Sequence, residues 1–342
     1  MQAAVAAAEK LFLSSLIANL AGMSAIPRRH AEINGIRLAY AEAGAGPLVL
    51  LVHGWPETAH SWRHQMRALA EAGYRAVAPD MRGYGESDVP DAIEDYTILH
   101  LVGDLVGLLD HLGAPEAVVV GHDWGAPVAW HAALLRPDRF RAVAAMSVAH
   151  TLRPVHAPLA TLRRFGYDRF YWLYFQEPGV AEAELEHDVA RSLRRIYHAA
   201  SGDVPADWHW RAVVPERGGL LDTTLEPAAR PAWLAPEDFA FYIAAFQKSG
   251  FRGGLNWYRN IDRNWALMAP FGDAKIRQPA LFIAGERDPT LRIGGRRDRL
   301  AAMDDAVSGL RGKILIPRAG HWVQQEAAAR VNSELIAFLR GL

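Results

Sequence analysis

The stretch "VVVGHDWGAP", residues 118–127, decides the fold expected for this chain. Its valines predict a buried strand, and the small residues Gly121 and Gly125 allow the chain to turn sharply into a helix. Asp123 lies at the tip of this turn. Turns of this form usually present a serine nucleophile, so the carboxylate at this position needs a chemical explanation. The simplest alternative is that Asp123 only caps the following helix.

The composition is that of an ordinary globular chain. It has 342 residues, of which 51% are hydrophobic and 22% are charged, and a formal net charge of −1. This near-neutral balance indicates no basic surface for nucleic acid and none for an anionic membrane. Because the sequence contains no cysteine, disulfides, thiolate metal sites and cysteine nucleophiles are excluded.

Residues 1–29 are expected to form an N-terminal extension. Residues 11–22 are an apolar run that is too short to cross a bilayer, so no stable membrane span is expected. Two interpretations stay open: an extra helix on a cytoplasmic protein, or a signal peptide within residues 1–25 that would export it. No positive charge leads the chain, and Glu9 and Lys10 cancel before the run, which favours the cytoplasmic interpretation.

Strand and helix patterns alternate through most of the remaining chain. Short apolar strands are expected at residues 47–54, 74–80, 117–123, 140–148, 280–288 and 313–321. Helical patterns between them predict an α/β fold with a mostly parallel sheet covered on both faces. A hairpin around Asn34 and Gly35 precedes these strands.

The alternation stops in residues 149–270, where aromatic and helix-like sequence is broken by proline and glycine. We therefore expect a core formed by residues 30–148 and 271–342, with residues 149–270 inserted as a helical cap.

Two further residues fit a site built around Asp123. Asp288 ends one predicted strand, and His321 follows the last one. Nucleophile, acid and histidine in this order are characteristic of the α/β-hydrolase fold. The ends of parallel strands meet at one sheet edge, so these side chains should come together. Glu286 is the alternative acid.

The loop "HGWPE", residues 53–57, follows the first of these apolar strands. The backbone N–H of Trp55, with that of Trp124 after the nucleophile, could form an oxyanion hole. Pro56 fixes the direction of the loop, and its peptide bond is a candidate for the cis form.

A carboxylate nucleophile restricts the reaction. Attack on an ester would give a high-energy anhydride, whereas attack on an sp³ carbon gives an ordinary ester. Water activated by His321 could then hydrolyse that ester, with Asp288 orienting the imidazole. The residues therefore predict an enzyme that acts on epoxides or alkyl halides and needs no metal or organic cofactor.

The sequence resembles the epoxide hydrolases of the α/β-hydrolase superfamily, of the soluble epoxide hydrolase type, from about residue 30 to the end. The motifs that carry this resemblance are "HGWPE", "DMRGYGESD", "GHDWG", "YWLYFQEPG", "LNWYRN", "GERD" and "GHW". The resemblance implies that two cap tyrosines, here Tyr171 and Tyr258, hold and protonate the epoxide oxygen. Trp172 departs from the family, in which glutamine is common at this position. The resemblance does not include the N-terminal phosphatase domain of the mammalian enzymes.

The expected activity is hydrolysis of apolar epoxides to vicinal diols through a covalent hydroxyalkyl ester of Asp123. The expected partners are the epoxide and water, and the protein is expected to be a monomer or a homodimer. The side chains expected to bind substrate are those of Trp55, Pro56, Trp124, Trp172 and Tyr174. Aromatic cap residues expected near the pocket are Phe165, Trp172, Phe175, Trp208, Trp210 and Phe241.

Two other functions remain as alternatives. A haloalkane or haloacid dehalogenase would use the same Asp–His–Asp chemistry, and Trp124 could then bind the halide. The tyrosine pair favours an epoxide, because a halide is a weak base that leaves without a proton. A non-catalytic ligand-binding protein on this fold is the second alternative.

Overall fold

The structure is a computed structural model that describes residues 26–205, 207–292 and 296–342. Residues 1–25, with the possible signal peptide, therefore lie outside the described residues. The first strand starts at Arg28, slightly before the predicted start of the core at residue 30.

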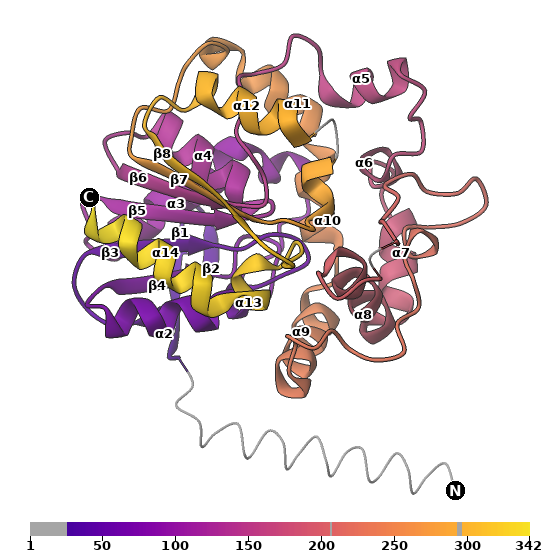
Figure 1. Cartoon of the computed structure of the whole chain (residues 1–342), viewed down its shortest axis with the longest axis horizontal. Helices are drawn as coiled ribbons and strands as arrows, with labels where there is room; N and C mark the ends of the chain where they lie inside the picture. Colours follow the sequence, from indigo (N-terminus) through magenta and orange to yellow (C-terminus); the bar gives the residue numbers. More distant parts are fainter. Residues whose placement is uncertain (1–25, 206, 293–295) are drawn as a thin grey trace, which may run out of the picture.

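An eight-stranded sheet forms the centre of the protein (Figure 1). The strands are β1 (Arg28–Ile33), β2 (Ile36–Ala43), β3 (Leu48–Val52), β4 (Arg75–Pro79), β5 (Ala117–His122), β6 (Phe140–Met146), β7 (Ala280–Gly285) and β8 (Leu310–Ile316). Their order in the sheet is β1-β2-β4-β3-β5-β6-β7-β8. Strand β2 is antiparallel to β1 and β4, and the pairs from β4 to β8 are parallel. The mostly parallel sheet predicted from the alternation is confirmed.

The β1–β2 hairpin has the turn that its sequence predicts. Asn34 and Gly35 both have positive φ, 49° and 77°. A two-residue turn with two positive φ angles matches the right-handed twist of the strands, and asparagine followed by glycine adopts it readily.

Helices cover both faces of the sheet because its central strands are apolar on both sides. On one face, Leu50 and Val52 pack with α3 (Ile98–His111), α4 (Gly125–Leu135) and α12 (Arg296–Ala306). On the other face, Val49 and Leu51 pack with α2 (Arg63–Glu71), α13 (Val323–Glu326) and α14 (Ala328–Arg340). This alternation along β3 follows from the two-residue period of a strand.

The chain between β6 and β7 is helical. Its helices are α5 (Pro158–Arg164), α6 (Tyr171–Tyr174), α7 (Val180–His187), α8 (Val189–Ala200), α9 (Pro236–Ser249), α10 (Arg252–Arg259) and α11 (Ile261–Leu267). Short 3₁₀ turns in this segment are η3 (Leu221–Thr223) and η4 (Ala269–Phe271). Elsewhere in the chain the 3₁₀ turns are η1 (Ala59–Trp62), η2 (Ile93–Tyr96) and η5 (Pro289–Arg292). Figure 1 shows α5–α9 on one side of the sheet, to the right in this view.

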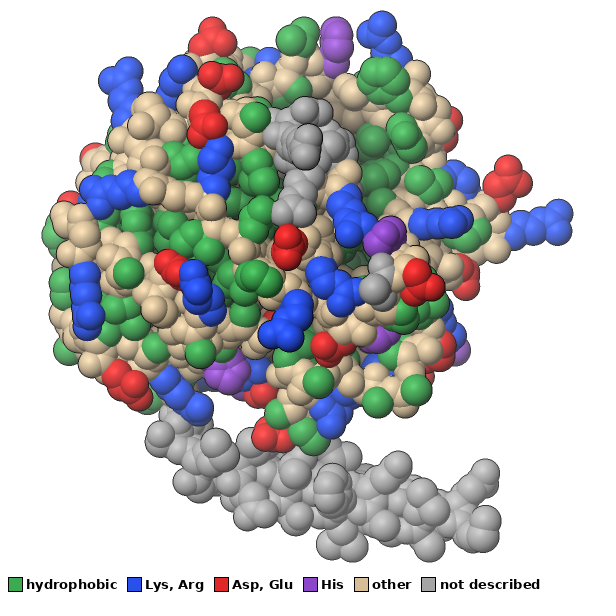
Figure 2. All heavy atoms as spheres, viewed as in Figure 1, with side chains coloured by type: hydrophobic (Ala, Val, Ile, Leu, Met, Phe, Trp, Pro, Cys, Tyr) green, Lys and Arg blue, Asp and Glu red, His purple; other side chains and the backbone are tan. Residues whose placement is uncertain are grey.

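The surface agrees with the nearly balanced composition. Figure 2 shows basic and acidic side chains interspersed over the visible face, without a large patch of one sign. In the described part of the chain, no helix is both long enough and apolar enough to span a bilayer.

Candidate active site

The turn after β5 holds Asp123 in an unusual backbone conformation. Its φ of 50° lies in the left-handed region, which few residues other than glycine adopt. The flanking glycines make the turn possible. A Cβ at Gly121 would lie 2.0 Å from the Gly125 carbonyl oxygen, and a Cβ at Gly125 would lie 2.0 Å from the Val52 carbonyl oxygen. The Asp123 side chain is thereby raised at the carboxyl edge of the sheet.

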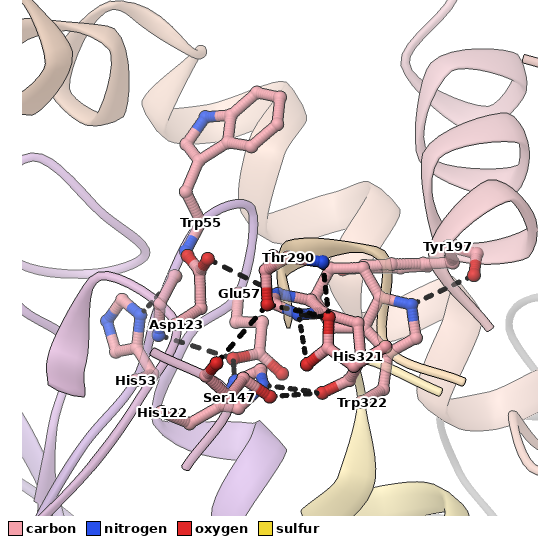
Figure 3. Close-up of polar contacts among 12 residues, drawn as sticks. His53, Trp55, Glu57, His122, Asp123, Ser147, Tyr197, Thr290, His321 and Trp322 are labelled. Carbon is pink, nitrogen blue, oxygen red and sulfur yellow. Dashed lines mark hydrogen bonds and ion pairs between the residues drawn. The ribbon is translucent and has the colours of Figure 1, made fainter. Parts of the chain in front are cut away.

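Three side chains from three strand ends form a chain of contacts, and Figure 3 labels two of them, Asp123 and His321. His321 Nε2 lies 3.2 Å from Asp123 Oδ2. Its Nδ1 lies 3.1 Å from each carboxylate oxygen of Asp288. Asp288 is itself fixed by Thr290, whose backbone N–H and hydroxyl lie 2.8 and 2.7 Å from Oδ1. Glu286, the alternative acid, is exposed to solvent.

The two carboxylates and the imidazole set one another's protonation states. Burial alone would raise the pKa of Asp123, but the hydrogen bond and charge of His321 hold it below its usual value. Burial alone would lower the pKa of His321, but Asp288 and Asp123 hold it well above its usual value. Burial also opposes ionisation of Asp288, yet its contact with His321 keeps its pKa low. The site therefore holds an imidazolium between two carboxylates.

The loop after β3 approaches the same carboxylate. The Trp55 backbone N–H donates to Asp123 Oδ1 at 2.7 Å. A Cβ at Gly54 would lie only 2.3 Å from the Asp123 Cβ, so glycine is required for this approach. The Trp55–Pro56 peptide bond is cis. The Trp124 amide follows Asp123 directly, at the start of α4.

A buried pair behind the site was not assigned from the sequence. Glu57 Oε2 lies 2.8 Å from His122 Nδ1, and both side chains are fully buried. His122 Nε2 lies 2.8 Å from the His321 carbonyl oxygen. Figure 3 shows Glu57 and His122 beside Asp123 and His321. The only signal of this pair in the sequence is a glutamate in the loop 53–57, which follows an apolar strand.

The two predicted tyrosines lie together and line the same cavity as Asp123, although they are far apart in the sequence. Tyr171 comes from α6 and Tyr258 from α10, and their ring centroids are 5.8 Å apart. The Tyr258 ring also packs edge-on against Trp124 at 5.0 Å. Burial, reinforced by the Asp123 charge, raises the pKa of both phenols, so each is a protonated donor.

A cavity of about 980 Å³ opens beside Asp123. Tyr171 and Tyr258 line it together with the predicted substrate-binding residues Trp124 and Trp172. The predicted cap aromatics that also line it are Phe165, Trp208 and Trp210. A pocket of this size with mostly apolar walls suits an apolar ligand. In the described residues no three His, Asp or Glu side chains group into a set able to hold a metal ion.

Three predicted substrate-binding side chains do not line this cavity. The Tyr174 hydroxyl turns away and donates to Glu184 at 2.9 Å. The Trp55 indole packs among other aromatic rings, with the Phe175 centroid at 5.4 Å. Pro56 contributes its carbonyl oxygen to a hydrogen bond from Tyr197 at 2.7 Å. The prediction that these side chains contact substrate is therefore not supported.

Two of the predicted pocket aromatics are also placed elsewhere. Phe175 is completely buried and packs between the Trp55 and Tyr258 rings. Phe241 stacks on His60 at 4.2 Å. Both therefore stabilise the packing of α6 and α9 and do not form cavity wall.

The strand order and the sharp turn after β5, with an acid and a histidine following β7 and β8, define a protein of the α/β-hydrolase class. The sequence profile of the alpha/beta hydrolase fold family matches residues 47–328. This chain belongs to that family and, within it, to the epoxide hydrolases, as its relatives show. The resemblance drawn from its motifs is confirmed.

The relatives match nearly the whole chain. Epoxide hydrolase A of Mycobacterium tuberculosis (strain ATCC 25618 / H37Rv) is 49% identical, over 94% of this chain and 99% of its own. The structure of an epoxide hydrolase from an endophytic Streptomyces is 43% identical, covers 92% of this chain and 95% of its own, and gives a TM-score of 0.89. The crystal structure of epoxide hydrolase A from Mycobacterium thermoresistibile is 49% identical, covers 92% of this chain and 98% of its own, and gives a TM-score of 0.86.

Proposed function

We propose that this protein hydrolyses apolar epoxides to vicinal diols, with Asp123 as the nucleophile. One observation carries the proposal: the Asp123 carboxylate, paired with His321 at 3.2 Å, shares a cavity with two protonated tyrosines. An epoxide needs a nucleophile at carbon and a proton at oxygen, and this arrangement supplies both.

In the first half-reaction, Tyr171 and Tyr258 hydrogen-bond the epoxide oxygen. Ionised Asp123 attacks one ring carbon, the carbon–oxygen bond breaks, and a tyrosine gives its proton to the departing alkoxide. The product is a hydroxyalkyl ester of Asp123. Because this step turns a carboxylate into a neutral ester, it removes one of the two negative charges that keep His321 protonated.

In the second half-reaction, His321 acts as a base. His321 first gives its proton to the tyrosine that protonated the alkoxide. The tyrosine is then protonated again and His321 is neutral. Neutral His321, oriented by Asp288, takes a proton from water, which attacks the ester carbonyl. The backbone N–H groups of Trp55 and Trp124 stabilise the resulting oxyanion. Collapse of this intermediate breaks the bond between the Asp123 carbonyl carbon and the alkyl oxygen. The alkyl oxygen takes the proton that remained on the added water oxygen, so the diol leaves and Asp123 returns to its carboxylate form.

Residues 149–270 act in this proposal as a cap that brings the tyrosines over the core, residues 30–148 and 271–342. The substrate is apolar because the cavity walls are mostly aromatic and aliphatic. A cytoplasmic location and a monomeric or homodimeric state remain predictions. Fractionation of cells and light scattering of the purified protein would test them.

The substrate class is tested with a panel of styrene oxide, trans-stilbene oxide, an epoxy fatty acid and a bromoalkane. We expect diol from at least one epoxide and no bromide, because the tyrosines serve an oxygen leaving group. Bromide release with every epoxide untouched would identify a dehalogenase instead. Tight binding of epoxides without turnover would support the non-catalytic alternative.

Removing the tyrosine hydroxyls should slow only the opening of the epoxide. We expect Tyr258→Phe or Tyr171→Phe to lower kcat/KM for the best epoxide by about 10²-fold, the usual scale of general acid catalysis. The double variant should lose nearly all activity. Tyr174→Phe is the matched control, since its hydroxyl faces Glu184, and it should retain the wild-type rate. Equal losses in all three single variants would mean that the hydroxyls act only through packing.

A further inference from the structure

Glu326, the last residue of α13, accepts hydrogen bonds from three backbone amides. Two of them flank His321: Gly320 N–H donates to Oε2 at 2.8 Å, and Trp322 N–H donates to Oε1 at 3.0 Å. The third belongs to Gly202, which follows α8 and also donates to Oε2 at 2.8 Å. A single carboxylate thus joins the histidine loop to the segment after α8.

The residues around Gly202 form further contacts with the His321 loop and with the loop after β7. We call residues 200–204 the docking segment. The His321 backbone N–H donates to the carbonyl oxygen of Ala200 at 2.8 Å. Arg287 donates from its guanidinium to the carbonyl oxygens of Gly202 and Val204, the latter at 2.6 Å. The docking segment therefore meets the His321 loop through the backbone of Ala200, and it meets the loop after β7 through the Arg287 side chain.

The two segments approach so closely that neither has room for a side chain. A Cβ at Gly320 would lie 2.3 Å from the Gly202 nitrogen, and a Cβ at Gly202 would lie 2.1 Å from the Arg318 carbonyl oxygen. The backbone N–H groups of Gly202 and Gly320 both need an acceptor at this close approach. The Glu326 carboxylate is the group that supplies it.

We propose that Glu326 is a positioning residue for the second half-reaction, holding the His321 loop against the docking segment so that the imidazole meets the Asp123 ester. Glu326 acts through the backbone, because its carboxylate accepts hydrogen bonds from the amides on either side of His321 and from Gly202. This inference rests on the proposed function, in which His321 is a base only after the ester has formed.

The test is Glu326→Gln. Glutamine keeps one acceptor oxygen but places an NH₂ donor against amides that are themselves donors. A shift of the histidine by a fraction of an ångström is costly for a proton transfer. We expect hydrolysis of the ester to slow by about tenfold or more, while ester formation stays within about twofold of wild type. In steady state, kcat and KM should fall together and kcat/KM should stay nearly constant.

The measurement is rapid quenching with trans-stilbene oxide, or with the best epoxide of the panel, followed by the intact mass of the protein. Accumulation of a covalent adduct in Glu326→Gln, beyond that in the wild type, is the expected result. Glu326→Asp keeps the carboxyl group on a shorter side chain, and its adduct level should lie between those of Glu326→Gln and the wild type. Glu334→Gln, in the Arg330–Glu334 ion pair of α14, beyond the His321 loop contacts along the chain, is the control and should match the wild type.

Different outcomes separate this inference from the proposed function. If Glu326→Gln slows both half-reactions equally, or leaves both unchanged, the positioning role is wrong. If Glu326→Gln does not fold, Glu326→Asp decides in the same way through its adduct level. A wild type that forms neither adduct nor diol with any epoxide would contradict the proposed function itself.

Discussion

Asp123→Ala is expected to abolish diol formation, with a loss of about 10⁴-fold or more in kcat. The carboxylate is the only acidic side chain that lines the cavity in the described part of the chain. Without it no covalent ester forms, and His321 has no ester carbonyl toward which it can direct water. The tyrosines alone can polarise the epoxide, but no nucleophile stands opposite them.

The measurement is diol release by gas or liquid chromatography, with circular dichroism to verify the fold. Asp123→Asn is the companion variant, because asparagine adopts the left-handed φ of 50° more readily than alanine. A single turnover with excess wild-type enzyme, in water labelled with the heavy oxygen isotope, should give unlabelled diol, since the new oxygen comes from Asp123. Labelled diol in that first turnover would mean that water attacks the epoxide directly.

His321→Gln is expected to separate the two half-reactions. Asp123 should still open the epoxide, because the Trp55 N–H at 2.7 Å and the tyrosines remain in place. The ester should then persist, since no base is left to activate water, and turnover should fall by about 10³-fold or more. Intact mass spectrometry should show one bound epoxide per protein molecule. Recovery of free protein at the wild-type rate would rule out His321 as the base.

Acidic buffer should slow hydrolysis of the Asp123 ester in the wild type, as His321→Gln does. Low pH protonates His321 in the ester and removes the base, so hydrolysis slows as the pH falls. Ester formation instead needs ionised Asp123, whose pKa is held low by His321, and so continues at lower pH. The adduct should therefore accumulate in mildly acidic buffer and disappear when the pH is raised. The His321→Gln adduct should not respond to this change.

Much of the site could be predicted because local sequence determines local geometry. A valine strand followed by Gly-x-Asp-x-Gly leaves few conformations other than a sharp strand-to-helix turn, and Asp123 occupies its tip. His321 could be selected among 14 histidines because it follows a predicted strand. Parallel strands bring such positions to one edge, whatever the length of chain between them.

Side-chain direction was harder to predict. Tyr171 and Tyr174 are three residues apart on the short helix α6, and only Tyr171 faces the cavity, since Tyr174 is bonded to Glu184. The sequence of residues 149–270 also did not show which aromatic side chains line the cavity and which are buried in the core. Phe175 is buried beneath the site, whereas Trp210 lines the cavity. These differences depend on which helix packs against which, and helical periodicity does not contain that information.

The sequence by itself determined the strand–helix alternation, the turn that carries Asp123, and the chain order of nucleophile, acid and histidine. Only the tertiary structure decided which distant groups support them: Glu57 on His122, and Glu326 between the histidine loop and Gly202. The physical reason is the distance along the chain over which each interaction acts. Strand and turn preferences act over a few residues, whereas a buried carboxylate is satisfied by whatever donors the packing of distant segments brings to it.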